Sequence, residues 1–161
     1  MIDIKQVHKS FGNREILKGI DLHVPTGSVT VILGPSGSGK TTFLRTLNFL
    51  EKADAGTMQL NDISVDLHKA SNKEILNARR NTSMVFQSYN LFSNKTVIEN
   101  IMEGLVTVKK MKKSQAREIA QRFLKEVGME GYDDYYPVQL SGGQQQRIGI
   151  ARALADRKSV V

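Results

Sequence analysis

One stretch constrains the fold of this chain more than any other, the segment Gly34–Thr42 with the sequence GPSGSGKTT. It matches the pattern G-x-x-x-x-G-K-[ST], in which a glycine-rich loop joins a strand to a helix. Glycine lets the backbone curl so that successive N–H groups point inward at an anion. A helix that begins at about Lys40 adds the positive end of its dipole to the same place. The stretch therefore predicts a phosphate-binding loop within an α/β fold.

The side chains of this loop predict which phosphates it holds. Lys40 can reach the β- and γ-phosphates of a nucleoside triphosphate, and Thr41 can place its hydroxyl on Mg²⁺. The other residues that we assign to phosphate binding are Gly34, Ser36, Gly37, Ser38, Gly39 and Thr42. The alternative is a glycine-rich turn that matches the pattern by chance.

The flanks of the loop favour phosphate binding over a chance match. Residues 27–33 are a near-continuous apolar run of strand formers, which predicts a parallel strand covered on both faces. After the loop, Phe43, Leu44 and Leu47 recur at helical spacing, so we expect a helix over 40–50.

The remainder of the first half is typical of short strands. Gly12-Asn13 predicts a hairpin turn between two of them, and Pro25–Gly27 predicts a turn before the apolar run. The elements that we expect here are strands over 2–7, 16–24, 56–60 and 84–86, a turn at 61–62 and a helix over 71–80.

Helical patterns dominate the second half. Thr96–Glu99 is a capping-box pattern, and a helix should follow it to about Val108. Apolar residues recur at helical spacing from Ser114 to Val127, and Gly128 sits where a C-terminal cap belongs. A third helix should follow Ser141.

These patterns predict three segments in a chain of 161 residues. Residues 1–87 form a nucleotide-binding α/β core with an antiparallel β-subdomain, residues 88–140 form a helical subdomain, and residues 141–161 form a helix that returns toward the core. The chain has no cysteine, which excludes disulfides, thiolate metal sites and cysteine catalysis. No segment approaches the roughly 20 apolar residues of a membrane span, and the N-terminus lacks a signal-peptide core. We therefore expect a chain that is neither exported by a cleaved signal nor membrane-spanning.

The net charge of +7 indicates a basic surface that could meet nucleic acid, an anionic membrane face or nucleotide phosphates. The one dense basic run is Lys109–Lys113, for which the simpler interpretation is a solvated helix end or loop. No stacking aromatic residues accompany the run, which argues against binding of single-stranded nucleic acid.

A second glycine motif lies at Leu140–Gln144, with the sequence LSGGQ. Ser-Gly-Gly before a helix offers free N–H groups, a hydroxyl and a positive helix end, which together can bind an anion. The alternative is an ordinary serine N-cap with glycines for the turn.

With this second motif the sequence resembles the ATP-binding-cassette (ABC) ATPases, whose signature LSGGQ is identical to Leu140–Gln144. Phe11 is similar to the aromatic residue that stacks on adenine in that family, and Gln87 resembles the glutamine of its Q-loop. The resemblance covers residues 2–155. Within the family, the sequence around Phe43–Asn48 and Met84–Phe92 is most similar to bacterial importers of polar amino acids, of cystine or glutamine type.

The resemblance implies a fold, a P-loop NTPase cassette with an N-terminal antiparallel β-subdomain, a parallel-sheet core and a helical subdomain. It implies ATP and Mg²⁺ as cofactors, with Lys40 and Gln87 as catalytic residues and with Thr41 and Gln87 at the metal. Without the resemblance, a lone Phe beside a turn is more often a core residue, and a Gln at a strand end is more often solvated.

The resemblance also implies partners. Ser141, Gly142, Gly143 and Gln144 would bind the γ-phosphate of ATP held by a second copy, so that the active form is a homodimer. Residues 88–139 would contact membrane permease subunits, which places the protein at the cytoplasmic face of the cell membrane, and we expect no nucleic-acid partner.

In ABC ATPases a strand ending in Asp, then a Glu and later a His follow the signature helix, and the resemblance predicts them here as well. Residues 156–161 do not supply them, and Val160-Val161 are either the start of that strand or frame-shifted sequence. We therefore expect the ATPase subunit of an amino-acid importer, as an N-terminal part that lacks the C-terminal part of the core and is inactive alone. The alternatives are a non-catalytic ATP-binding or degenerate product, and a non-transport ABC protein that acts on ribosomes or DNA.

Overall fold

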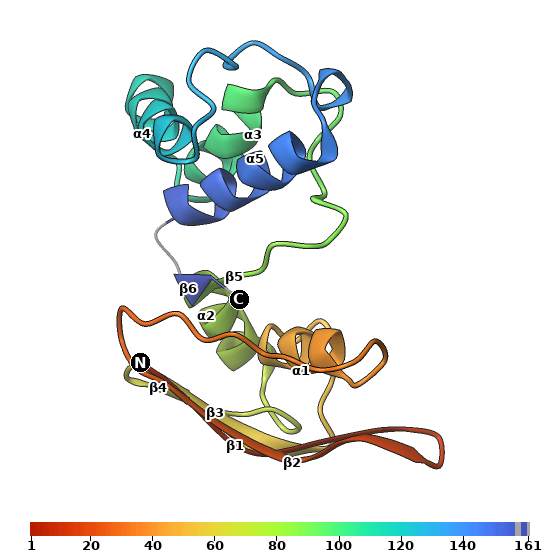
Figure 1. Ribbon diagram of the computed structural model, residues 1–161. Helices are drawn as coiled ribbons and strands as arrows, with labels where there is room; N and C mark the ends of the chain where they lie inside the picture. The colour runs from red at the N-terminus through yellow and green to blue at the C-terminus, as the bar shows by residue number, and fades with distance from the viewer. Residues whose placement is uncertain (157–158, 161) are drawn as a thin grey trace. The chain divides into compact units, whose positions relative to one another are not determined.

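A computed structural model describes residues 1–156 and 159–160. The chain divides into two compact units, Met1–Thr82 and Ser83–Val161 (Figure 1). Within the described residues, no helix is both long enough and apolar enough to cross a membrane.

The first unit is built on a four-stranded antiparallel sheet with the strand order β2-β1-β3-β4. The predicted Gly12-Asn13 turn is confirmed, because Phe11 at the end of one strand pairs with Arg14 at the start of the next. Gly12 has a φ of +57°, which a tight turn of this kind requires. The strands are β1 (Ile2–Phe11), β2 (Arg14–Val24), β3 (Ala55–Leu60) and β4 (Ile63–Asp66).

Two helices complete this unit, α1 (Lys40–Leu47) and α2 (Asn72–Asn81). Figure 1 shows α1 over one face of the sheet. Its buried side chain Phe43 joins Ile4 and Met58 of the sheet in one apolar cluster. The helix therefore anchors the end of the preceding loop on the sheet.

The predicted parallel strand over 27–33 is wrong for this structure, because these residues form no strand. Three of their apolar side chains are largely exposed, with Val29 at 92%, Val31 at 71% and Leu33 at 86%. A parallel strand needs neighbouring strands on its edges and cover on its faces. Among the residues that the structure describes, no strand pairs with this segment, so the apolar run has no ladder to join.

The predicted strand over 84–86 is also wrong, and a short strand lies just before it instead. This strand, β5 (Thr82–Ser83), pairs with β6 (Ser159–Val160). Val160 therefore lies in a strand, which agrees with the interpretation that Val160-Val161 begin a strand. Val161 lies outside the described residues. The four-stranded sheet is antiparallel in all of its pairings, so it corresponds to the predicted antiparallel β-subdomain and not to the predicted parallel-sheet core.

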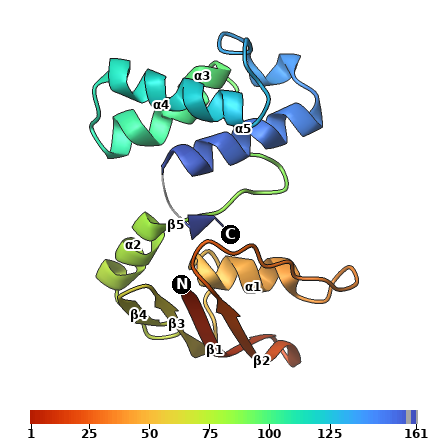
Figure 2. The same ribbon diagram turned by 60° about the vertical axis from the view of Figure 1, so that its left-hand side comes forward.

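The second unit is a helical lobe in which α3, α4 and α5 pack together; Figure 2 shows the three side by side. Its core includes Ile98, Ile101, Leu124 and Ile148. The predicted helix to Val108 changes type at Gly104, where the α-helix continues as a π-helical turn. The elements are α3 (Val97–Glu103), the π-helical turn η1 (Gly104–Val108), α4 (Lys113–Glu126), the 3₁₀ turn η2 (Pro137–Gln139) and α5 (Gly142–Ala155).

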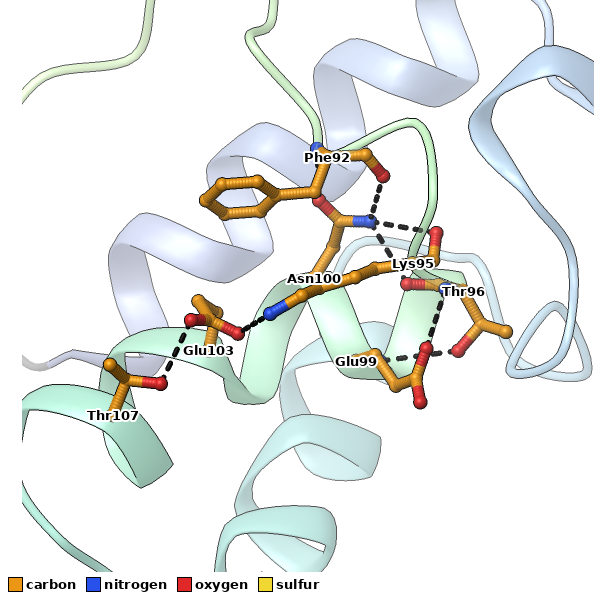
Figure 3. A network of polar contacts seen from close by, with 7 residues as sticks. All are labelled: Phe92, Lys95, Thr96, Glu99, Asn100, Glu103 and Thr107. Atoms are coloured by element: carbon orange, nitrogen blue, oxygen red, sulfur yellow. Dashed lines mark hydrogen bonds and ion pairs between the residues drawn. The ribbon is translucent and has the colours of Figure 1, made fainter.

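A buried asparagine fixes the approach to α3, as Figure 3 shows. Asn100 is fully buried, and its side chain accepts a hydrogen bond from the Phe92 N–H and donates to the carbonyl oxygens of Phe92, Lys95 and Thr96. The predicted capping box is confirmed beside it, because Thr96 and Glu99 exchange both bonds. The loop before α3 is therefore held by side chains rather than by a sheet.

The basic run Lys109–Lys113 extends from the end of η1 to the first residue of α4, and all four of its lysines are exposed, as the simpler interpretation expects. Lys109 is ion-paired with Asp156 at 2.9 Å and also donates to the Asp156 carbonyl oxygen. This pair joins the start of the run to the end of α5.

Candidate nucleotide-binding site

The predicted phosphate-binding loop ends where expected, because α1 begins at Lys40. Gly39 is the N-cap residue and has a φ of +95°, in the left-handed region. A Cβ at this position would lie 2.8 Å from Cγ2 of Ile16 and 3.2 Å from Cδ2 of Leu17. Position 39 therefore requires glycine for two reasons, the left-handed backbone conformation and the close approach to β2.

The loop curls back on itself before the helix. The Ser38 N–H donates to the Pro35 carbonyl oxygen at 3.3 Å. Gly37 also has a positive φ, +78°, but a Cβ there would point into open space. The two glycines thus differ, since Gly37 is needed for conformation alone.

Lys40 closes this loop with its own side chain. The ammonium donates to the carbonyl oxygens of Gly34 and Pro35, both at 2.8 Å. These are neutral acceptors, and phosphate oxygens form stronger, charge-assisted bonds with an ammonium group. The cation is therefore already at the loop and can exchange carbonyl oxygens for phosphate oxygens.

An open hollow of about 480 Å³ lies beside the loop. Thr41 is exposed at the first turn of α1, so its hydroxyl is accessible to a metal ion. Within the described residues no group of three or more His, Cys, Asp or Glu side chains could hold a metal. The lining residues of the hollow include Leu17, Leu22, Ile32, Leu33, Gly34, Ser38 and Lys40.

Phe11 lies at the end of β1 and is 49% exposed, so it is not a core residue. No sequence pattern points to its neighbour Lys9, whose ammonium lies 5.0 Å from the centre of the Phe11 ring. Lys9 is nearly buried, pairs with Glu51 at 3.0 Å and donates to the Lys52 carbonyl oxygen.

Gln87 is exposed in a turn of the second unit. It does not end a strand, contrary to expectation, because β5 stops at Ser83. The structure groups Gln87 with the second glycine motif in one unit, and it groups Phe11 with the phosphate-binding loop in the other.

The second glycine motif forms the start of α5. Ser141 is the N-cap residue, its hydroxyl accepts from the Gln144 N–H at 3.3 Å, and the Gln144 side chain accepts from the Ser141 N–H at 2.8 Å. In this structure Ser141 therefore acts as a helix N-cap, as the simpler alternative for this motif expects. Gly142 and Gly143 are exposed at the helix N-terminus, where N–H groups face outward and the dipole favours an anion.

Comparison with known proteins gives one consistent result. Residues 17–161 match the profile of the family described as ABC transporter. The chain is 52% identical over 161 residues to the L-cystine import ATP-binding protein TcyN of Bacillus subtilis (strain 168), covering 100% of this chain and 62% of that protein. It is 47% identical over 163 residues to the L-cystine transport system ATP-binding protein TcyN of Escherichia coli (strain K12), covering 99% and 65%.

A solved structure also matches, the ATP-binding cassette MJ0796 in a dimeric post-hydrolysis state bound to ADP and Pi. The TM-score is 0.84 at 34% identity, and the match covers 98% of this chain and 71% of that one. The chain spans less than two thirds of the length of the two cystine relatives. The profile match over residues 17–161 shows that the chain belongs to the ABC transporter family.

Proposed function

We propose that this chain provides the ATP-binding and ATP-hydrolysing part of a bacterial importer of polar amino acids, of cystine type. The observation that carries the proposal is the loop at the start of α1, closed by Lys40, in a chain 52% identical to an L-cystine import ATP-binding protein. The amino-acid names of the relatives also favour transport over action on ribosomes or DNA.

The phosphates of ATP would lie in the Gly34–Thr42 loop. Lys40 would release its two carbonyl oxygens and donate to the β- and γ-phosphates, while the loop N–H groups hold the remaining phosphate oxygens. Thr41 would place its hydroxyl on Mg²⁺, which neutralises phosphate charge when bound. The half-exposed ring of Phe11 would stack on the adenine.

Gln87 would contact the metal ion or the attacking water. Gly142 and Gly143, with Ser141 and Gln144, would bind the γ-phosphate of ATP on a second copy, which makes the active form a homodimer. The dimeric MJ0796 cassette supports such an arrangement by analogy. Residues 88–139 would contact the permease at the cytoplasmic face of the membrane.

Residues 1–161 alone should bind Mg-ATP with little turnover. The resemblance calls for an Asp and a Glu after the signature helix, and no such pair follows Ala155 within residues 1–161. Phosphoryl transfer depends on positioning and charge, so turnover should require these groups.

The test uses the full-length protein encoded by the gene, with steady-state hydrolysis of Mg-ATP as the readout. Lys40→Ala should lower kcat about 100-fold or more, because it removes a cation from the transferring phosphate. Lys69→Ala is the matched control, because Lys69 is an exposed lysine of the same unit. Deletion of the gene should abolish uptake of one polar amino acid among a labelled panel. Hydrolysis unaffected by Lys40→Ala, or uptake unchanged after deletion, would contradict the proposal.

A further inference from the structure

One arginine of α5 holds the segment that follows Gln87. The Arg152 guanidinium donates through Nη1 to the Asn90 carbonyl oxygen at 2.9 Å and through Nη2 to the Tyr89 carbonyl oxygen at 3.1 Å. Burial lowers the pKa of the Arg152 guanidinium below its ordinary value. The two charged bonds are therefore made in a place that is partly shielded from water.

The two residues that Arg152 binds have an unusual backbone. Tyr89 has a φ of +61° and Asn90 a φ of +46°, in the left-handed region that residues other than glycine seldom adopt. Such a conformation persists where the surroundings impose it. The left-handed pair turns both carbonyl oxygens toward one guanidinium, whose planar fork supplies two donors.

The same segment also lies close to α5 at other points along the helix. The Tyr89 hydroxyl lies 3.2 Å from the position that a Cβ of Gly142 would take, at the first turn of the helix. Two turns later, a Cβ at Gly149 would lie 3.7 Å from the Tyr89 carbonyl oxygen. The Arg152 guanidinium lies 5.8 Å from the centre of the Phe92 ring. Tyr89 thus reaches from the Arg152 end of α5 to the glycine motif.

The other side of the segment is fixed to α3. Asn100 bonds to both the N–H and the carbonyl oxygen of Phe92, as Figure 3 shows. The stretch from Tyr89 to Phe92 is therefore held by one side chain from each of two helices in the same unit.

We propose that Arg152 is a positioning residue that locks the Gln87 turn to the helix bearing Ser141–Gly143. The turn and the glycine motif then keep a fixed spacing and move as one body. The role given to Gln87 rests on the proposed function, whereas the locking itself is a property of the second unit and needs no nucleotide.

Spin-label mobility tests the locking directly, because the chain has no cysteine to remove. A nitroxide is attached at Ser88→Cys, beside Gln87, and in a separate protein at Glu118→Cys, on the exposed face of α4. Arg152→Ala should sharpen the spectrum of the label at 88 and leave that at 118 unchanged. Arg147→Ala is the matched control, because Arg147 also lies on α5 and donates to a carbonyl oxygen, that of Val127. It should change neither spectrum.

An unchanged spectrum at 88 in folded Arg152→Ala would overturn the proposal. If Arg152→Ala does not fold, Arg152→Lys decides, because lysine keeps the charge without the two-pronged geometry. Increased mobility at 88 in that variant supports the locking, and unchanged mobility overturns it.

Kinetics of the full-length protein test the positioning of Gln87. Arg152→Lys should lower kcat about 10-fold while KM and the Kd for ATP stay constant, because misplacement affects reaction geometry rather than ground-state binding. An unchanged kcat despite increased mobility would overturn the positioning role. If Gln87→Ala itself leaves kcat unchanged, the role of Gln87 in the proposed function fails while the locking stands.

Discussion

The ammonium nitrogen of Lys40 lies 2.8 Å from the carbonyl oxygen of Gly34, six residues earlier at the start of the same loop. The contact means that the loop forms a closed ring around its cation without any ligand. A phosphate group would replace a neutral acceptor with a charged one at the same position. The ring is thus prepared for an anion, and each of the residues that shape it can be tested separately.

The two left-handed glycines of the loop should differ in their tolerance of a side chain. Gly39→Ala should lower the free energy of unfolding by more than Gly37→Ala, because a methyl group at 39 also meets Ile16 at 2.8 Å. Gly37→Ala should lower the free energy of unfolding by about 1–2 kcal/mol, the cost of the left-handed backbone alone. Urea denaturation measures both, and equal losses would show that β2 does not pack against the loop in solution.

Asn100→Ala should be among the most destabilising polar substitutions in the second unit. It leaves the backbone groups that Asn100 satisfies at Phe92, Lys95 and Thr96 without that partner. Unsatisfied buried groups should lower the free energy of unfolding by about 2–4 kcal/mol, measured by chemical denaturation. Asn77→Ala, on the exposed face of α2, is the control. Similar stabilities for the two variants would contradict the buried network.

Acid should weaken the contact network at the end of α3. Hydrogen bonds from Lys95 and then from Thr107 lower the pKa of Glu103 below its ordinary 4.5 (Figure 3). Because the folded-state pKa is lowered, the stabilisation is complete above pH 4.5 and is lost as the pH falls through the folded-state pKa. The stability difference between the wild type and Glu103→Gln should therefore shrink from pH 7 to pH 3.

The measurement is a series of urea melts across that range, with Glu118→Gln as an exposed control that makes the same charge change. A gap between the wild type and Glu103→Gln that stays constant down to pH 3 would show that the network does not form in solution.

Substitutions at Ser141 separate its role as a helix cap from a role in binding phosphate. Ser141→Ala should lower stability by about 1 kcal/mol through loss of the bond to Gln144. Ser141→Asp should keep the cap but place a negative charge where the γ-phosphate of a second copy would lie. We therefore expect Ser141→Asp to fold normally and to hydrolyse ATP poorly. Normal hydrolysis by a stable Ser141→Asp protein would leave Ser141 a cap and nothing more.

Signals within a few residues predicted this structure well. The Thr96–Glu99 capping box depends on two residues three positions apart, and both of its hydrogen bonds form. Gly128 has the left-handed backbone, φ +69°, of a helix C-terminal cap, as its position after the apolar stripe indicated. Such features are decided locally, so the sequence around them is sufficient.

Features that need distant partners were predicted poorly. The run around Val31 has the composition of a buried strand, but strand formation depends on neighbours that the described residues do not provide. The strand β4 at Ile63–Asp66 was missed for the opposite reason, since its four residues are stabilised by pairing with β3. The role of Arg152 could not be predicted from local sequence, because its contact with Tyr89 joins residues 63 positions apart.

Titration of Mg-ATP into the purified full-length protein, followed by calorimetry, decides whether the Gly34–Thr42 loop binds nucleotide. The wild type should bind, and Lys40→Ala should raise the Kd about 10- to 100-fold through loss of charge-assisted hydrogen bonds. Lys69→Ala should bind as the wild type does. Equal affinities for the wild type and a folded Lys40→Ala protein would contradict nucleotide binding at this loop.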